Sequence, residues 1–288
     1  MDQQTLPEYE QSAMETTPCP LCGGADYREE IEFSPFTVVQ CQACELYYLS
    51  PRLTAEAITK IYQQDNYFDE SAEGGYSSYL EQELALRATY RRFLKGLKRE
   101  GLSGGDLLEI GCGFGYFLDE ARPYFKHTTG TDFSSGACQA AGEVADHVFL
   151  GGLAEVPAEM SANLIVALNV LEHTYDPVQF LKDASSKLSA GGKIIMAVPN
   201  MDSFIRKLMG RGWPSYKVPE HTLYFIKNTL IRVMQEAGLQ NVKTTPFLHA
   251  FPVNLIASKF KLKLPSAFQK LMIWVPTTMV AAIGEKNE

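Results

Sequence analysis

Four cysteines close to the N-terminus have the residue type and the spacing of a metal site. They form two Cys-x-x-Cys pairs separated by eighteen residues, Cys19-Pro-Leu-Cys22 and Cys41-Gln-Ala-Cys44. Two such pairs can direct four thiolates at one tetrahedral ion. Gly23 and Gly24 allow a turn that brings backbone amides to the sulfurs, and residues 31–39 have the composition of a short hairpin. The pattern predicts a zinc ribbon over residues 1–50.

The predicted zinc ion is structural, because four protein ligands leave no open coordination position. A module of about fifty residues has little core, so metal binding would supply much of its folding free energy. Two alternatives remain for these cysteines: a redox-active pair, which usually stands at a strand–helix junction, or two disulfides. The other two cysteines, Cys112 and Cys138, are expected to be buried and reduced.

A glycine-rich turn is the second pattern that could do chemistry. Residues 106–110 form an apolar strand, and Gly111-Cys-Gly-Phe-Gly115 follows it at the start of an expected helix. Glycines at a strand–helix junction let a ligand approach the backbone closely. A side chain at Gly111 or Gly113 would fill that space or strain the turn. The turn therefore predicts a binding site for a nucleotide-like cofactor.

The acid that ends the next strand indicates which cofactor is bound. Asp132 follows the strand expected at residues 127–131 and lies 17 residues after Gly115. There its carboxylate can accept hydrogen bonds from both ribose hydroxyls of an adenosine-type cofactor. A dinucleotide site requires Gly-x-Gly-x-x-Gly, but Tyr116 occupies the position of the third glycine. The pattern favours a nucleoside without a pyrophosphate group.

The elements that position these residues alternate in type along the chain. Short apolar strands are expected at 106–110, 127–131, 163–169 and 193–198, and helices near 54, after 75, and over 116–124, 177–188 and 228–237. Such alternation predicts a parallel sheet covered by helices on both faces. Asn228 is the expected cap of the last helix, and Gly238 ends it. We expect a helical linker or lid over residues 51–104 and a catalytic domain over residues 105–288.

Composition restricts the class of protein. A hydrophobic content of 45% and a charged content of 21% are those of a globular protein. The net charge of −8 argues against a nucleic-acid partner. The first residues lack the basic and apolar segments of a signal peptide, and residues 264–284 are too interrupted to span a membrane, so a cytoplasmic location is expected. Lysines at Lys259, Lys261 and Lys263 form either a solvated face or a weak contact with an anionic membrane surface.

Three segments, in order, resemble class I S-adenosylmethionine-dependent methyltransferases. The segments are Leu108-Glu-Ile-Gly-Cys-Gly-Phe-Gly115, Val170-Leu-Glu-His-Thr-Tyr-Asp-Pro177 and Leu188-Ser-Ala-Gly-Gly-Lys-Ile-Ile-Met-Ala-Val-Pro-Asn200. The resemblance covers most of residues 105–240. It implies a Rossmann-like α/β fold, with a seven-stranded sheet and helices on both faces, and S-adenosylmethionine as the cofactor.

The resemblance also implies roles for individual residues. The residues implied to bind the cofactor are Glu109, Gly111, Gly113, Gly115, Asp132, Phe133, Leu153 and Asn169. Asp132 would bind the ribose, Phe133 would flank the adenine, and Leu153 would present its backbone to the adenine ring. Two positions depart from the family pattern: Gly152 stands where an acid is common, and Asn163 replaces the usual Asp before the fourth strand.

Candidates for the chemical step lie after the fourth and fifth strands. The sequence Glu220-His-Thr-Leu-Tyr224-Phe resembles a subgroup that includes zinc-containing sugar methyltransferases. It implies His221 as the general base, Glu220 as a site residue and Tyr224 as a substrate contact. His173 is a second catalytic candidate. The alternatives are that His221 caps the next helix and that His173 is a hydrogen-bonded structural residue.

Tyr76 and Tyr79 could form a lid over the cofactor, and Tyr76 is also a candidate substrate contact, although aromatic residues at this spacing are more often part of a core. The favoured function is methyl transfer from S-adenosylmethionine to an O, N or C atom of a small molecule, such as a sugar or a natural-product intermediate. One alternative is a non-catalytic S-adenosylmethionine-binding protein whose zinc ribbon docks a partner. Another is an NAD-dependent oxidoreductase, which the missing third glycine disfavours.

Overall fold

A computed structural model describes residues 10–62, 83–253 and 271–287 of the chain. The lid candidates Tyr76 and Tyr79 and the lysine segment at 259–263 lie outside the described residues. Within the three described ranges, no helix combines the length and the apolar character needed to cross a membrane.

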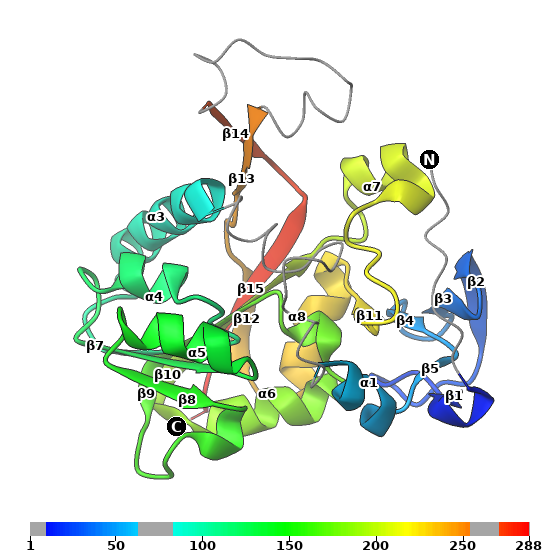
Figure 1. The fold of residues 1–288 in the computed structure, drawn as a ribbon, viewed down its shortest axis with the longest axis horizontal. Coiled ribbons are helices and arrows are strands. Elements are labelled where there is room, and N and C mark those ends of the chain that lie inside the picture. The colour runs from blue at the N-terminus through cyan, green and yellow to red at the C-terminus, as the bar shows by residue number, and fades with distance from the viewer. Residues whose placement is uncertain (1–9, 63–82, 254–270, 288) are drawn as a thin grey trace.

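A seven-stranded mixed sheet forms the centre of the molecule (Figure 1). Its strands, in spatial order, are β12 (Gln240–Thr244), β15 (Met279–Glu285), β10 (Leu188–Pro199), β9 (Ala162–Leu168), β6 (Asp106–Ile110), β7 (His127–Asp132) and β8 (His147–Leu150). The five strands from β10 to β8 are parallel. This arrangement confirms the Rossmann-like methyltransferase fold.

One strand differs from the parallel sheet expected from the alternation. β15 runs antiparallel to both β10 and β12. It lies between these two strands, inside the sheet and not at its edge. The alternation of strands and helices predicted the first part of the sheet and could not predict this reversal.

Helices cover both faces of the sheet. Their bounds are α3 Glu83–Arg99, α4 Tyr116–Ala121, α5 Ser135–Gly142, α6 Pro177–Ser186 and α8 Lys227–Glu236. Strand β9 is buried on both sides: Leu164 and Val166 join the core formed with α3 and α4, whereas Ile165 and Ala167 join the core formed with α6 and α8. This two-sided burial explains why its sequence is a continuous apolar run.

The helices before the sheet match the expected spacing. α1 (Ala55–Tyr62) begins after Thr54, whose Oγ1 accepts a hydrogen bond from the Ala57 amide at 3.2 Å. α3 buries the four apolar residues that recur at helical intervals, Leu86, Tyr90, Phe93 and Leu97. Arg87 of α3 contacts Asp119 of α4 at 2.8 Å and thereby ties the two helices together.

The expected Asn228 cap is wrong. α8 already includes Asn228, because the helix begins at Lys227. Thr229 supplies the side-chain oxygen instead, since its Oγ1 accepts the Ile226 amide at 3.0 Å. Gly238 follows the helix with a φ of 89°, as expected of a residue that ends a helix in the left-handed region.

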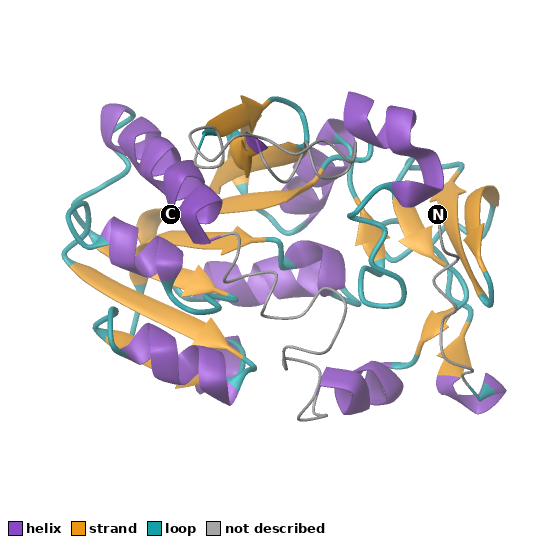
Figure 2. Ribbon diagram, turned by 45° about the horizontal axis from the view of Figure 1, so that its top comes forward, coloured by secondary structure: helices purple, strands orange, loops and turns teal. Residues whose placement is uncertain are grey.

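A second, smaller sheet lies at the other end of the molecule from α3, α4 and α5 (Figures 1 and 2). It contains four antiparallel strands in the order β11 (Leu223–Tyr224), β4 (Tyr47–Leu49), β3 (Phe36–Cys41) and β2 (Tyr27–Phe33). The β2–β3 hairpin confirms the hairpin expected between the two cysteine pairs. β11 comes from the region after the fifth strand of the large sheet, so the ribbon sheet is completed by a distant segment.

The remaining elements are short. They are β1 (Met14–Glu15), β5 (Arg52–Leu53), β13 (His249–Pro252), β14 (Met272–Val275), α7 (Phe204–Met209) and the 3₁₀ helices η1 (Gln11–Ala13), η2 (Leu153–Glu155), η3 (Leu171–His173) and η4 (Gly210–Gly212). β1 pairs with β5, and β13 pairs with β14.

Candidate functional site

The four N-terminal cysteines converge on one point. The Sγ atoms of Cys19 and Cys44 are 3.4 Å apart, those of Cys22 and Cys41 are 3.5 Å apart, and all four lie within 4.8 Å of one another. Four thiolates around one zinc ion stand about 3.8 Å apart, given Zn–S bonds of about 2.3 Å. All four are free thiols, so neither pair forms a disulfide here.

The turn geometry around the sulfurs suits a metal. Gly23 has a φ of 71°, which favours glycine, and a Cβ on Gly24 would lie 3.3 Å from Cys22 Sγ and 3.4 Å from Cys41 Sγ. Backbone amides of both pairs donate to the sulfurs, among them Cys22 to Cys19 and Cys44 to Cys41. Amide donors partly neutralise thiolate charge, so the donor set fits a tetrahedral cation.

At the carboxyl end of β6, the glycines are required by the protein's own packing. Gly111 has a φ of 71°, and a Cβ there would lie 2.5 Å from Cγ2 of Val170. Gly115 has a φ of 76°, and its Cβ would lie 2.9 Å from the Cα of Ala141. Of the two effects expected of a Gly111 side chain, strain in the turn is confirmed by the positive φ, whereas the atoms that a Cβ would meet belong to Val170.

Asp132 is fixed beside this turn. Its Oδ2 accepts the Gly113 amide at 2.8 Å, and its Oδ1 accepts the Ser134 amide at 2.9 Å. Gly113 has a φ of 51°, in the left-handed region that favours glycine. Burial raises the pKa of Asp132 although these amides act in the opposite direction. The arrangement joins the glycine-rich turn and the acid of β7 into one unit.

Glu109 is the second carboxylate at this end of the sheet. It is 3% exposed, and its Oε2 has no hydrogen-bond partner among the described residues. Burial raises its pKa well above the usual range, and the charge of Asp132 raises it further. A buried carboxylate oxygen without a partner suits a cofactor that brings a hydrogen-bond donor or a cation.

Phe133 and Leu153 are the residues expected to lie beside the adenine. Phe133 is 77% exposed, although it is a large aromatic residue. A Cβ on Gly152 would lie 3.3 Å from the Phe133 Cζ, so the ring occupies the space beside this glycine. This contact gives a physical reason for glycine where the family pattern has an acid. Leu153 is half-buried and begins η2 directly afterwards.

Two asparagines lie at opposite ends of β9. Asn169 follows its carboxyl end, is exposed and has a φ of 58°. It therefore stands at the same edge as Gly111 and Asp132. Asn163 lies near the amino end, where its Oδ1 accepts the Asp106 amide at 2.8 Å and its Nδ2 donates to Ser189 at 3.1 Å. Asn163 thus ties three strands together.

His173 and His221 come together beside β9, with Glu172 next to them. The two rings are perpendicular, with centroids 4.6 Å apart. One potential ligand atom from each of Glu172, His173 and His221 lies within 4.8 Å of the others. Sequence reasoning missed Glu172. Its position between a buried strand and His173 in Leu171-Glu-His173 was the available signal.

Burial controls the charge of this cluster. Burial, aided by the positive charge of Lys217, lowers the pKa of His173 to about 4. Burial lowers the pKa of His221 well below its usual range, with His173 and Lys217 adding to the effect. Burial raises the pKa of Glu172 to about 8. Both imidazoles are therefore neutral at pH 7 and each offers one nitrogen lone pair.

Glu220 and Tyr224 flank His221 in different ways. The backbone of Glu220 hydrogen-bonds to His173, and its side chain is half-buried. Tyr224 lies in β11, is 2% exposed, and has its ring centroid 6.2 Å from that of His221. The alternative that His221 caps the next helix is wrong, because Thr229 caps α8 and His221 Nδ1 lies 2.9 Å from the Ser215 carbonyl.

The two remaining cysteines differ from each other. Cys112 is 2% exposed, as expected. Cys138 is only half-buried, and its thiol donates to the Asp132 carbonyl at 3.3 Å. Cys138 therefore packs against the backbone of the candidate cofactor site.

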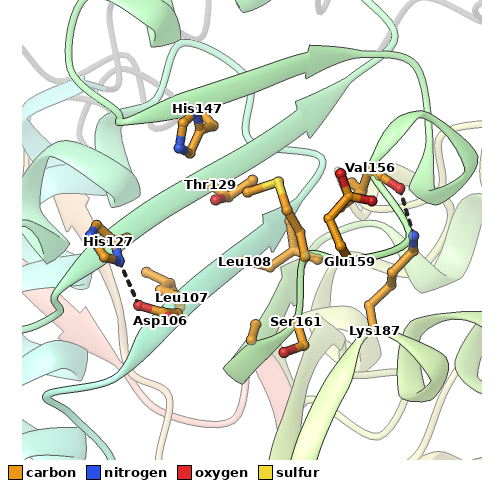
Figure 3. Close-up of a pocket in the computed structure, with 12 residues that line it drawn as sticks. Asp106, Leu107, Leu108, His127, Thr129, His147, Val156, Glu159, Ser161 and Lys187 are labelled. Carbon is orange, nitrogen blue, oxygen red and sulfur yellow. Dashed lines mark hydrogen bonds and ion pairs between the residues drawn. The ribbon is translucent and has the colours of Figure 1, made fainter.

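A cavity of about 280 Å³ opens at the amino ends of β6, β7, β8 and β9 (Figure 3). Here His127 Nδ1 contacts Asp106 at 2.8 Å, and the Lys187 ammonium donates to the Val156 carbonyl at 2.6 Å. Gly111 and Asp132 stand at the carboxyl ends of the same strands. The cavity is therefore separate from the candidate cofactor site.

Comparison with known proteins identifies the family of the central part of the chain. A family model described as a methyltransferase domain matches residues 77–244. A probable S-adenosylmethionine-dependent methyltransferase of Mycolicibacterium smegmatis is 29% identical over 150 residues, which are 51% of this chain and 56% of that protein. A ubiquinone biosynthesis O-methyltransferase of Maricaulis maris is 29% identical over 147 residues, covering 46% of this chain and 58% of that protein. The chain thus spans little more than half the length of these relatives.

Solved structures share the fold. A methyltransferase from Thermotoga maritima, described as a possible histamine N-methyltransferase, superposes with a TM-score of 0.54 at 21% identity, covering 73% of this chain and 96% of that one. The family match extends over more than half of the sequence and contains the glycine-rich turn, Asp132 and the histidine cluster. This chain belongs to the methyltransferase domain family.

Proposed function

We propose that the protein transfers a methyl group from S-adenosylmethionine to a small-molecule acceptor. The observation that carries the proposal is the pair of amide hydrogen bonds, from Gly113 and Ser134, that hold the Asp132 carboxylate beside the glycine-rich turn. S-adenosylmethionine supplies an electrophilic methyl group when it is bound.

Asp132 binds the ribose hydroxyls, and the bare backbone of the turn borders the methionine part. Glu109 supplies its unpartnered oxygen to this edge. Phe133, Leu153 and Asn169 complete the set, with the exposed Phe133 ring against the adenine. An exposed aromatic ring next to a carboxylate suits a ligand with a flat base and a polar sugar.

The acceptor is activated in the histidine cluster. Val170 touches the position of Gly111, and the next residues along the chain lead directly to Glu172 and His173. The cluster therefore adjoins the turn that borders the transferable methyl. His221 is the candidate base: because its Nδ1–H donates to the Ser215 carbonyl, the Nε2 lone pair is left to accept a proton.

A small-molecule acceptor is supported by the net charge of −8, which disfavours nucleic acid. The related protein of Maricaulis maris is named an O-methyltransferase, which supports an oxygen atom as one candidate acceptor. Four cysteines hold a structural zinc ion in the ribbon, next to the strand β11 that carries Tyr224.

The test is calorimetric binding of S-adenosylhomocysteine, followed by turnover once an acceptor is found. Wild-type protein should bind the nucleoside and should not bind NAD⁺. His221→Gln should keep the binding and lose turnover, because the base does not contact the cofactor's sugar. Absence of any binding by the folded wild-type chain would rule out the proposal. Unchanged turnover in His221→Gln would remove His221 as the base.

A further inference from the structure

Glu172 is a buried carboxylate with no partner from another residue that the structure describes. It is 1% exposed, Oε1 and Oε2 make no hydrogen bond with another described side chain or backbone group, and the only hydrogen bond that favours its charged form comes from its own backbone. A buried carboxyl group usually has partners, because leaving it without them costs several kcal/mol of desolvation. A ligand that binds carboxylate oxygen would therefore stabilise this site.

The two histidines next to Glu172 are oriented by backbone groups. The Nδ1 of His221 lies 2.9 Å from the Ser215 carbonyl, which can only accept, so Nδ1 carries the hydrogen. His173 makes a comparable hydrogen bond to the backbone of Glu220. In metal sites a histidine ligand commonly donates one ring N–H to a carbonyl while the other nitrogen binds the ion. Both histidines make the backbone hydrogen bond of this arrangement.

The three side chains converge. Their potential ligand atoms lie within 4.8 Å of one another, and the imidazole planes meet at 89°. Ligand pairs on a tetrahedral ion with bonds of about 2.0–2.2 Å stand about 3.4 Å apart, so small side-chain rotations would bring them onto one ion. Perpendicular rings can aim their lone pairs at a common point without a steric clash.

We propose that Glu172, His173 and His221 bind a divalent transition metal ion, with zinc as the first candidate. Two histidines and one carboxylate are a ligand set found in catalytic zinc sites and in non-haem iron sites, where positions remain open for substrate or water. The ion differs in role from the one in the ribbon, because four thiolates leave no open position and three ligands leave at least one.

The metal site deepens the proposed function and rests on it for its role. The ion would adjoin the glycine-rich turn through Val170, so its open position would take an oxygen of the acceptor. The acceptor class is then a hydroxyl or an enol. The ion lowers the pKa of that oxygen, its proton leaves to water, the oxygen–carbon bond forms, and the carbon–sulfur bond of the sulfonium breaks to give a thioether. His221 would act as a ligand in this case and not as the free base.

The experiment measures metal bound by the purified full chain. The protein is incubated with Co²⁺, freed of excess ion and analysed for total metal per chain. We expect two ions in the wild type, and one in Glu172→Gln and in His221→Gln, both of which keep the side chain's size. The control is His127→Gln, which removes a histidine that also contacts a carboxylate, but at the amino ends of the sheet strands. This variant should still bind two cobalt ions.

Cobalt bound by thiolates is identified by its sulfur-to-metal charge-transfer absorption, so the ion outside the ribbon can be counted separately. The absence of any non-thiolate ion in the wild type would overturn the proposal, even if the variants failed to fold. Equal loss in His127→Gln would also overturn it. S-adenosylhomocysteine binding measured on the same samples distinguishes the proposed function from the metal site. If the protein binds the nucleoside but only one metal ion, the proposed function stands and the metal site does not. If it binds two metal ions but no nucleoside, only the metal site stands.

Discussion

The Gly113 amide donates to Asp132 Oδ2 at 2.8 Å, and this bond joins the turn after β6 to the end of β7. Gly113 has a φ of 51°, a backbone conformation that favours glycine at this position. The predicted cofactor site is thus a coupled unit. Its two halves, which are separate motifs in the sequence, depend on each other for their geometry.

Asp132→Asn is expected to weaken the binding of S-adenosylhomocysteine by about 10- to 100-fold, because a hydrogen bond to a charged group contributes about 1.5–3 kcal/mol. Calorimetric titration measures the affinity. Asp146→Asn is the matched control. Asp146 also accepts a hydrogen bond from a backbone amide, that of Thr128 at 2.7 Å, but it lies toward the amino ends of the sheet strands. Equal affinities in wild type and Asp132→Asn would contradict the ribose role.

Gly111→Ala should destabilise the fold by about 2–4 kcal/mol, because it combines a positive φ with a Cβ 2.5 Å from Val170. Gly191→Ala is the control: its φ is 67°, but a Cβ there meets nothing within 4 Å. The Gly191→Ala variant should lose only about 1 kcal/mol of unfolding free energy, which is the cost of the left-handed backbone conformation. Urea unfolding measures both, and adding Val170→Ala should recover part of the loss at Gly111. Equal losses at the two glycines would show that the contact with Val170 is relieved without strain.

Removal of the ribbon metal should loosen β11 as well as the ribbon. Because β11 pairs with β4, with Leu223 opposite Tyr48, loss of the cysteine site should reduce amide protection at residues 223–224. Hydrogen exchange of the wild type and of Cys22→Ser, which removes one ribbon ligand and leaves Glu172, His173 and His221 unchanged, gives the readout. Amides of β6 should keep their protection and serve as the internal reference. Unchanged exchange in β11 would mean that the ribbon sheet holds without the ion.

His249 should make stability depend on pH below neutrality. Burial lowers its pKa to about 4 from an ordinary value of 6.5. The unfolded chain therefore binds more protons between these values, and stability should fall as pH drops from about 6.5 towards 4. The loss between pH 7 and pH 5 should be about 1–2 kcal/mol by urea unfolding.

His249→Phe is the control for this effect, because it keeps a ring against Phe251, which lies 4.7 Å from His249 between centroids. The variant should show a smaller loss of stability over the same pH interval. An identical pH dependence in the two proteins would assign the effect to other groups.

The local patterns of the sequence were sufficient for much of the fold. The strand at 106–110, the turn that starts at Gly111 and the four buried positions of α3 depend on neighbours within a few residues. Helical and strand periodicities express such short-range relations directly, so these elements were predicted. The Asn228 cap failed even at this scale, because Thr229 competes for the same role one residue later.

The sequence by itself determined the cysteine spacing, the glycine-rich turn with its acid, and the alternation that gives a Rossmann-like sheet, because each is written in neighbouring residues. Only the tertiary structure decided that β15 reverses direction, that β11 completes the ribbon sheet and that Glu172 faces His221. These relations depend on strand order and register between distant segments. No local pattern specifies which distant side chains share one small buried volume.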